Sequence, residues 1–206
     1  MTIEFRPCQA NDVNDVIPLM YSAGPEAYRY VFSVDDQEQA VDFLHYAFCH
    51  GDGEFGYKDH QVAVENNQIV ALVGRRSSKN NLAYTVTAIK QIFGYFGFIK
   101  ALKVMLRGLR FEKIVTPPPK NVVCLHNLAV SDDKQDEGIG QQVIKHFLTQ
   151  EKARKTTTVC LDVAETNPRA KVLYQRLGFV VKSKKLGKLK NKYGQGVSHE
   201  YMEIKL

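Results

Sequence analysis

The chain has 206 residues, of which 44% are apolar, and a formal net charge of +6 at pH 7. This length and composition are typical of one domain with an ordinary core and exclude an intrinsically disordered chain. The positive charge favours an anionic partner, such as a phosphorylated small molecule, nucleic acid or an acidic membrane surface. The sequence contains no run of about 20 uncharged apolar residues, so no membrane-spanning helix is predicted.

The four cysteines, Cys8, Cys49, Cys124 and Cys160, are scattered without C-x-x-C spacing. They are predicted to be reduced thiols of a cytoplasmic protein, and neither a disulfide framework nor a metal site is expected. The amino terminus, MTIEFRPCQANDV, has no uninterrupted apolar run and carries an early acid. Neither a secretory signal nor a membrane anchor is therefore predicted at this end.

The amino-terminal part of the chain predicts a strand followed by two helices. Residues 2–6 alternate between apolar and polar, as a short strand does. From Ala10 the apolar residues take helical spacing, with Asn11 or Asp12 as the capping residue. A second helix is predicted over residues 35–49.

A glycine-rich loop and a hairpin come next. The loop HGDGEFGY, residues 50–57, is predicted to be a connecting turn; the alternative is that its aromatic and acidic members, Glu54 among them, face a ligand. Two strands, 61–65 and 68–73, flank the pair Asn66-Asn67. Two consecutive asparagines between strands favour a type I′ turn, so these strands are predicted to pair as an antiparallel hairpin.

The segment between residues 85 and 119 is amphipathic and basic. Its apolar residues recur every three or four positions, at Ile89, Ile92, Phe93, Phe96, Ile99, Leu102, Leu106 and Leu109. A parallel basic stripe comprises Lys100, Lys103, Arg107 and Arg110. The pattern predicts one helix or a pair of helices, with glycines marking a bend near the middle and three prolines, 117–119, ending the segment.

The most informative stretch is VVCLHNLAVSDDKQDEGIG, residues 122–140. It reads as an apolar strand, an acidic turn and the start of a helix, with Gln135, Gly138 and Gly140 spaced as Q-x-x-G-x-G at the junction. Glycines allow a backbone to approach an anion closely, and the unpaired amides of a helix start point at it with the positive end of the helix dipole behind them. The spacing therefore predicts a phosphate cradle.

A second block follows the helix. The strand VCLDVA begins at Val159, and residues 167–179 read N-x-x-A-x-x-L-Y-x-x-L-G-F. Together with L-A-V and Q-x-x-G-x-G, this block resembles the GNAT superfamily of acyl-CoA-dependent N-acyltransferases over residues 120–181. The resemblance implies a single α/β domain over residues 1–206, with a mixed, mostly antiparallel sheet, helices on both faces and a V-shaped opening between strands 122–130 and 158–164.

The resemblance also implies that acetyl-CoA is the acyl donor. Its pyrophosphate is expected on the backbone amides of the cradle and its pantetheine along the strand edge before it. The cofactor-binding residues implied in this way are Leu128, Ala129, Val130, Gln135, Asp136, Glu137, Gly138, Ile139, Gly140, Gln141, Asn167 and Tyr174. Asn167 precedes Pro168, so a helix cap is the alternative role for it.

Three residues are candidates for the chemistry. Tyr174 occupies the family's general-acid position and is expected to give a proton to the departing thiolate, the alternative being a core aromatic. His126, whose ordinary pKa lies near 6.5, and Asp162 are the two candidate bases for the amine. The sequence does not choose between them, because a bulge in the splayed strand changes which face each side chain takes.

The chain departs from the family pattern at two places, the cradle and the 86–119 segment. Asp136 and Glu137 put carboxylates inside the cradle, where they weaken anion binding unless they point to solvent. The 86–119 segment replaces what is normally little more than a turn; a packed lid over the acceptor pocket is favoured over a homodimer contact and a helix bound peripherally to a membrane. The lysine-rich segment after residue 181 is predicted to be a solvated hairpin, with acidic-acceptor or nucleic-acid docking disfavoured.

These observations predict an N-acetyltransferase that acts by direct attack of a primary amine, from a small molecule or a peptide, on the acetyl thioester. The alternative is a CoA-binding regulatory or membrane-associated module that has lost turnover, as the acidic cradle and the basic insertion suggest. The sequence does not identify the acceptor.

Overall fold

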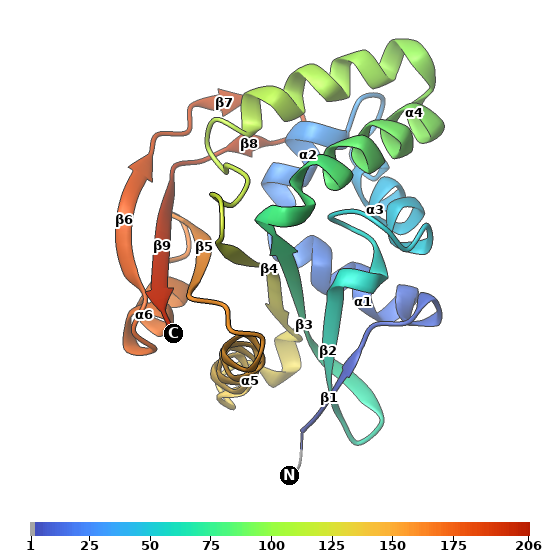
Figure 1. Ribbon diagram of the computed structural model, residues 1–206. Helices are drawn as coiled ribbons and strands as arrows, with labels where there is room; N and C mark the ends of the chain where they lie inside the picture. Colours follow the sequence, from blue (N-terminus) through green and yellow to red (C-terminus); the bar gives the residue numbers. More distant parts are fainter. Residues whose placement is uncertain (1–2) are drawn as a thin grey trace.

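A seven-stranded sheet in the order β1-β2-β3-β4-β5-β9-β6 forms the centre of the computed structural model, which describes residues 3–206 (Figure 1). Its strands are β1 (Glu4–Pro7), β2 (His60–Glu65), β3 (Gln68–Ser77), β4 (Val123–Val130), β5 (Thr158–Ala164), β6 (Val180–Lys185) and β9 (His199–Lys205). Only β4 and β5 pair in parallel within these residues. A separate small ribbon pairs β7 (Leu189–Lys190) with β8 (Gln195–Gly196). The predicted mixed, mostly antiparallel sheet is confirmed.

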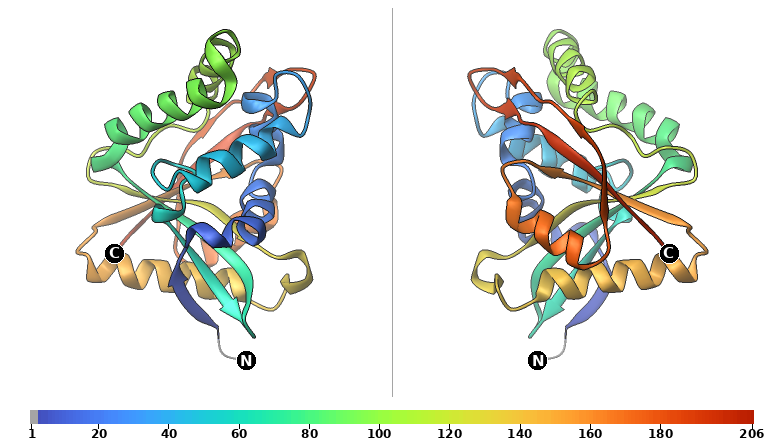
Figure 2. Two further views of the ribbon diagram at one scale, coloured as in Figure 1. Left: turned by 90° about the vertical axis from the view of Figure 1, so that its right-hand side faces the viewer. Right: turned by 90° about the vertical axis from the view of Figure 1, so that its left-hand side faces the viewer.

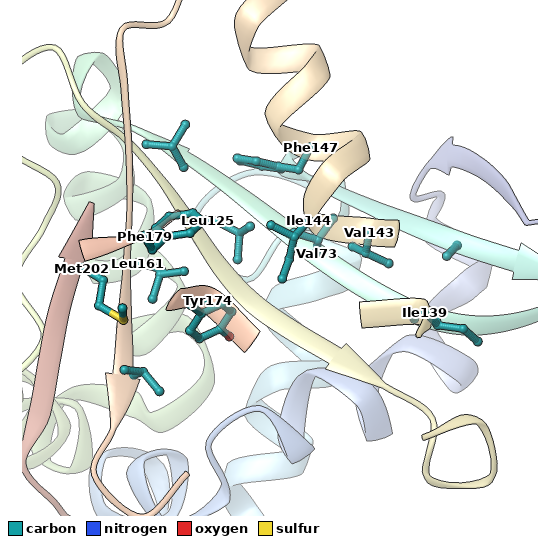
Figure 3. Close-up of a cluster of buried hydrophobic side chains, with 14 of the residues drawn as sticks. Val73, Leu125, Ile139, Val143, Ile144, Phe147, Leu161, Tyr174, Phe179 and Met202 are labelled. Atoms are coloured by element: carbon teal, nitrogen blue, oxygen red, sulfur yellow. The ribbon is translucent and has the colours of Figure 1, made fainter. Parts of the chain in front are cut away.

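Helices cover both faces of this sheet (Figure 2). They are α1 (Val13–Ser22), α2 (Pro25–Phe32), α3 (Gln39–Cys49), α4 (Asn81–Phe111), α5 (Ile139–Ala153) and α6 (Pro168–Arg176), with short 3-10 turns at Ala10–Asp12, Tyr57–Asp59, Ser78–Asn80 and Asp132–Lys134. Helices α1 and α3 pack on one face through Val16, Leu44 and Leu72. Helix α5 packs on the other through Ile144 and Phe147, in the core cluster of Figure 3.

The predicted elements are present, except that the helix predicted over residues 35–49 begins only at Gln39 and that one helix was not predicted. Asn66 and Asn67 have φ values of 50° and 65°, as the type I′ turn between β2 and β3 requires. Helix α2 was not predicted. It spans only eight residues, which is fewer than the roughly 11 to 18 over which helical periodicity is read from a sequence.

Strands β4 and β5 separate after their first residues. Their register joins only Val123 with Val159 and Cys124 with Cys160, so from Leu125 onward β4 has no ladder partner in β5 within the described chain. This divergence is the predicted V-shaped opening. It leaves one backbone edge of β4 free to bind something other than a strand.

A β-bulge re-aims the side chains of β4 inside the opening. Gly74 of β3 pairs with His126 and Leu72 pairs with Ala129, so β4 carries one residue more than β3 between these pairs. Asn127 takes a left-handed φ of 49° at that point. As a result Leu128 packs with the α5 cluster and Ala129 with the α1 cluster.

Helix α4 is broken at Gly97, whose φ of 67° and ψ of 173° are not helical. The predicted bend is therefore present. Before it, Ile92 and Phe96 are buried against α2 and α3, as a packed lid requires. Beyond it, Ala101 and Val104 are buried, while the predicted stripe residues Ile99, Leu102, Leu106 and Leu109 are exposed. The prediction of a fully packed lid is wrong for the second half, because the break changes the phase of the helix.

The lysine-rich segment after β6 is not simply solvated. Its tip, around β7 and β8, lies on α2: Asn191 Nδ2 donates to Tyr30 O at 2.9 Å and Tyr193 Oη to Val34 O at 2.8 Å. A Cβ atom at Gly194 would lie 2.4 Å from Glu26 O, so this glycine permits the close approach. The prediction of a free hairpin is therefore wrong at the tip, although several of its lysines are exposed.

Candidate active site

A cavity of about 780 Å³ occupies the V between β4 and β5, and we call it the β4–β5 cavity. Of the predicted residues, it is lined by His126, Leu128, Ala129, Val130, Gln135, Asp136, Gly138, Ile139, Gly140, Gln141, Asp162, Asn167 and Tyr174. Only Glu137 of that predicted set is not a lining residue. The structure thus brings the candidate cradle, acid and bases into one space.

The cradle has the backbone shape of an anion site. Asp136 and Gly138 both take left-handed conformations, with φ values of 70° and 78°, and Gly138 is the residue from which α5 starts. An added Cβ at Gly140 would lie 3.6 Å from Leu173 Cδ2 and from Val130 Cγ2. Glycine therefore keeps the first turn of α5 without a side chain where it lines the cavity, and the first amides of a helix are the groups that bind anions.

The two carboxylates in the cradle are compensated by cations. The Asp136 carboxylate pairs with the Arg169 guanidinium at the start of α6, and both side chains are exposed. The Glu137 carboxylate lies 3.7 Å from Lys134 Nζ, which also contacts Glu65 at 2.7 Å. Both acids are thus paired at the surface, leaving backbone amides to face an anion.

Tyr174 is buried on α6, with its ring edge-to-face on Phe179 at a centroid distance of 6.0 Å. Figure 3 shows its hydroxyl at the end of the ring that is turned away from Phe179 and Met202. Burial raises the pKa of Tyr174 to about 12. The residue is both a core aromatic and a lining residue of the β4–β5 cavity, so the two roles considered for it are compatible.

Asp162 presents an unpaired carboxylate on β5. Its Oδ1 atom is buried and accepts no hydrogen bond from any described residue. Burial raises the pKa of Asp162 to about 7, an effect that the charge of Lys185 reduces. A carboxyl group in this state exchanges a proton near neutral pH, which is what a base requires.

The raised pKa makes stability depend on pH. The unfolded carboxyl has a pKa of about 3.9, so between pH 4 and 7 the native state binds more protons and the free energy of unfolding falls as pH rises. Asp162→Asn removes the titrating carboxyl group, so the free energy of unfolding of the variant no longer falls for this reason as the pH rises. We expect the stability of the variant relative to wild type to increase from pH 4.5 to 7.5 in urea titrations. A pH-independent difference would show that Asp162 has an ordinary pKa.

His126 projects from β4 beside the bulge. Burial lowers the pKa of His126 well below its ordinary value, and the nearby His60 and Arg76 lower it further. A Cβ at the facing Gly74 would lie 2.6 Å from His126 Nε2, so the glycine makes room for the ring. His126 is therefore neutral at pH 7 and a weak proton acceptor.

Hydrogen bonds from distant segments hold the bulge. Tyr28 Oη donates to Asn127 Oδ1 at 2.7 Å, and Asn127 Nδ2 donates to His60 Nε2 at 3.1 Å. The opposite ring nitrogen of His60 lies 2.8 Å from Gly56 O. Burial lowers the pKa of His60 to about 4, so its ring is neutral: Nδ1–H donates to Gly56 O, and Nε2 accepts from Asn127 Nδ2. This network was not predicted, although an asparagine within a buried strand is a signal of one.

The glycine-rich loop proves to be a packed connection. Glu54 pairs with Arg76 at 2.8 Å, and Phe55 lies edge-to-face on Tyr28 and Phe32. Neither residue lines the β4–β5 cavity.

His199 of β9 does line the β4–β5 cavity, and it was not predicted to do so. Within residues 3–206, no group of three or more His, Cys, Asp and Glu side chains is arranged to hold a metal ion.

Comparison with known proteins identifies the family. Residues 28–181 match the family of GNAT acetyltransferase domains. The chain belongs to the GNAT acetyltransferase family. Over 55 residues this GNAT chain is 36% identical to the ribosomal protein bS18-alanine N-acetyltransferases of Escherichia coli K12 and Salmonella typhimurium. That match covers 27% of this chain and only 37% of each relative's length.

Solved structures share the GNAT fold along nearly the whole chain. An N-acetyltransferase from Staphylococcus aureus Mu50 has a TM-score of 0.72 at 13% identity, covering 98% of this chain and all of the other. An agmatine N-acetyltransferase has a TM-score of 0.59 at 16% identity, covering 99% of both chains. At such low identities, the structural similarity shows a common fold and nothing more.

Proposed function

We propose that this GNAT chain transfers an acetyl group from acetyl-CoA to a primary amine by direct attack of the amine on the thioester. The observation that carries the proposal is that the cradle, Tyr174 and Asp162 line the same cavity. In this scheme the amides of α5 bind the pyrophosphate, and the free edge of β4 binds the pantetheine and polarises the thioester carbonyl. Asn167 caps α6 by accepting a bond from Ala170 N at 3.0 Å.

The proton transfers follow from the two side chains. Asp162 takes a proton from the incoming ammonium, directly or through one water, because its pKa near 7 lets it be ionised when the amine arrives. The amine then attacks the carbonyl carbon, and the C–S bond breaks. Tyr174, which is protonated at neutral pH, donates its hydroxyl proton to the departing thiolate. The attacking nitrogen then releases its second proton, which restores the Tyr174 hydroxyl.

The proposal is tested by incubating the protein with acetyl-CoA and a panel of primary amines while detecting released thiol. The panel contains small diamines, lysine-type amines and peptides with free amino termini. Turnover above the no-acceptor background supports the proposal, and acetylation is confirmed by mass spectrometry. CoA binding without turnover on any member would favour a regulatory CoA-binding module.

Binding at the cradle is tested with Gly140→Leu. CoA should raise the melting temperature of the wild type by about 5–10 °C at 100 times its Kd, because it binds only the native state. The leucine side chain would extend past the Val130 and Leu173 contacts into the cavity, so the shift should disappear. Gly140 is a cleaner site than Gly138, whose positive φ would itself be strained by substitution.

The matched control is Gly108→Leu, at a helical glycine of α4 with nothing within 4 Å of an added Cβ. It should retain the full shift. Unchanged CoA affinity in Gly140→Leu, measured by calorimetry, would contradict the cradle assignment.

A further inference from the structure

The second half of α4 carries an unpartnered apolar face. Phe98, Ile99, Leu102, Leu106 and Leu109 are 70%, 74%, 46%, 58% and 56% exposed, and we call these five residues the outer face of α4. They recur at helical spacing, so they form one continuous ridge. Figure 1 shows this half of α4 along the upper edge of the molecule, at the end opposite α5.

This ridge is additional to the face that packs on the protein. Ala101 and Val104, on the opposite side of the same turns, are fully buried in the cluster with Phe43 and Phe96. When a helix is apolar on two opposite sides, one side packs in the core of the protein and the other exposes an apolar surface to water. Exposed apolar residues gathered on one element in this way mark an interaction surface.

The charges on the second half of α4 are all positive, and the first acid after it is the exposed Glu112 at its carboxyl end. No acidic residue occurs between Asn81 and Phe111. Lys103, Arg110 and Lys113 are exposed and form no ion pair within residues 3–206, whereas Lys100 pairs with Asp35 at 2.6 Å. The ridge is therefore flanked by three cations that the rest of the described chain does not neutralise.

We propose that the outer face of α4 docks on the surface of an anionic phospholipid bilayer, with the helix parallel to the membrane plane. The apolar ridge enters the boundary between headgroups and acyl chains, and the flanking cations contact lipid phosphates. Within the described residues, no helix is long and apolar enough to cross a bilayer, so binding is peripheral.

The charge pattern favours lipid over a second copy of this chain. A symmetric dimer through this ridge would bring two sets of uncompensated cations to one desolvated contact, with no acid on α4 to pair with them. An anionic bilayer supplies the missing negative charge. The end of α4 also places Phe111 edge-to-face on His199, a lining residue of the β4–β5 cavity, so the helix that carries the outer face ends near the proposed active site.

The absence of tryptophan from the sequence provides a direct probe. Phe98→Trp introduces one fluorophore on the outer face, and Leu186→Trp places a matched one at a similarly exposed apolar residue elsewhere. With vesicles of phosphatidylcholine and phosphatidylglycerol, we expect a blue shift and quenching by brominated acyl chains only for Phe98→Trp. Pure phosphatidylcholine vesicles should bind far more weakly.

Two double variants on α4, each with a matched double variant elsewhere as its control, then separate the contribution of the apolar ridge to binding from that of the charges. Leu102→Gln with Leu106→Gln should abolish vesicle flotation, while Val180→Gln with Leu186→Gln should not. Lys103→Glu with Arg110→Glu should weaken binding by about 25-fold or more, since each lost cation contributes about fivefold and the new carboxylates repel the anionic lipid. The control for charge is Lys145→Glu with Lys152→Glu, on α5.

The outcomes decide the proposal. Flotation that is salt-sensitive, lost in both α4 pairs and retained in both controls supports it. Three results overturn it: no flotation of the wild type, flotation with no fluorescence change in Phe98→Trp, or equal weakening by the α5 pair. Sedimentation that shows a dimer abolished by the glutamine pair on α4, without vesicle binding, would assign the face to a second copy instead.

Discussion

Tyr174→Phe is expected to lower kcat by about 10²-fold or more while leaving CoA affinity nearly unchanged. The substitution removes only the hydroxyl and keeps the ring that packs on Phe179. The departing thiolate would then have to take its proton from solvent instead of from a positioned donor. Steady-state kinetics by thiol release, with calorimetry for CoA, measures the two quantities separately.

Tyr30→Phe is the matched control. Tyr30 is as deeply buried as Tyr174, but it belongs to the helical layer and does not line the β4–β5 cavity. Removing the Tyr30 hydroxyl should leave kcat within a factor of about two of the wild-type value. If Tyr174→Phe retained full kcat, the proton would have to come from another donor, and the general-acid assignment would be wrong.

The parts of the site that are local in sequence were predictable. The motif Q-x-x-G-x-G predicted the backbone shape of the cradle, because the strand, the turn and the helix start that form it are consecutive in the sequence. Gly138 takes the left-handed conformation expected of a glycine at such a start. The same holds for the turn at Asn66 and Asn67. In each case the residues that determine the geometry are also the residues that adopt it.

Features that depend on distant contacts were not predictable. The bulge at Asn127 is held by Tyr28 and His60, which lie 99 and 67 residues away in the sequence. The outer face of α4 likewise follows from the conformation of Gly97: an unbroken helix would have put Ile99 close to the phase of Phe96, toward the buried side. Periodicity identifies an apolar stripe but not the break that turns part of it outward.

The base was also left open by the sequence, because the environment of a side chain sets its pKa. His126 has the more suitable pKa in water, and Asp162 the less suitable one. Burial reverses this order: it raises the pKa of Asp162 to about 7 and lowers that of His126 well below its ordinary value. The two candidates therefore predict different pH profiles.

Asp162→Asn is expected to lower kcat/KM by about 10²-fold at pH 7, the usual contribution of a general base. In the wild type, kcat/KM should rise with pH through a midpoint near 7, where Asp162 ionises. The variant should lose that limb and recover activity toward pH 9–10, since amines of pKa about 8–10 then deprotonate without help. Profiles from pH 5 to 10 with the best acceptor of the panel measure both effects.

His126→Ala distinguishes the alternative. If Asp162 is the base, this variant keeps a limb near pH 7, because the carboxylate still ionises there. If His126 is the base, the wild-type limb should instead lie well below pH 6.5, following the depressed pKa of the imidazole, and should vanish in His126→Ala. A limb that both variants retain would mean that neither side chain deprotonates the amine, which must then enter the cavity already neutral.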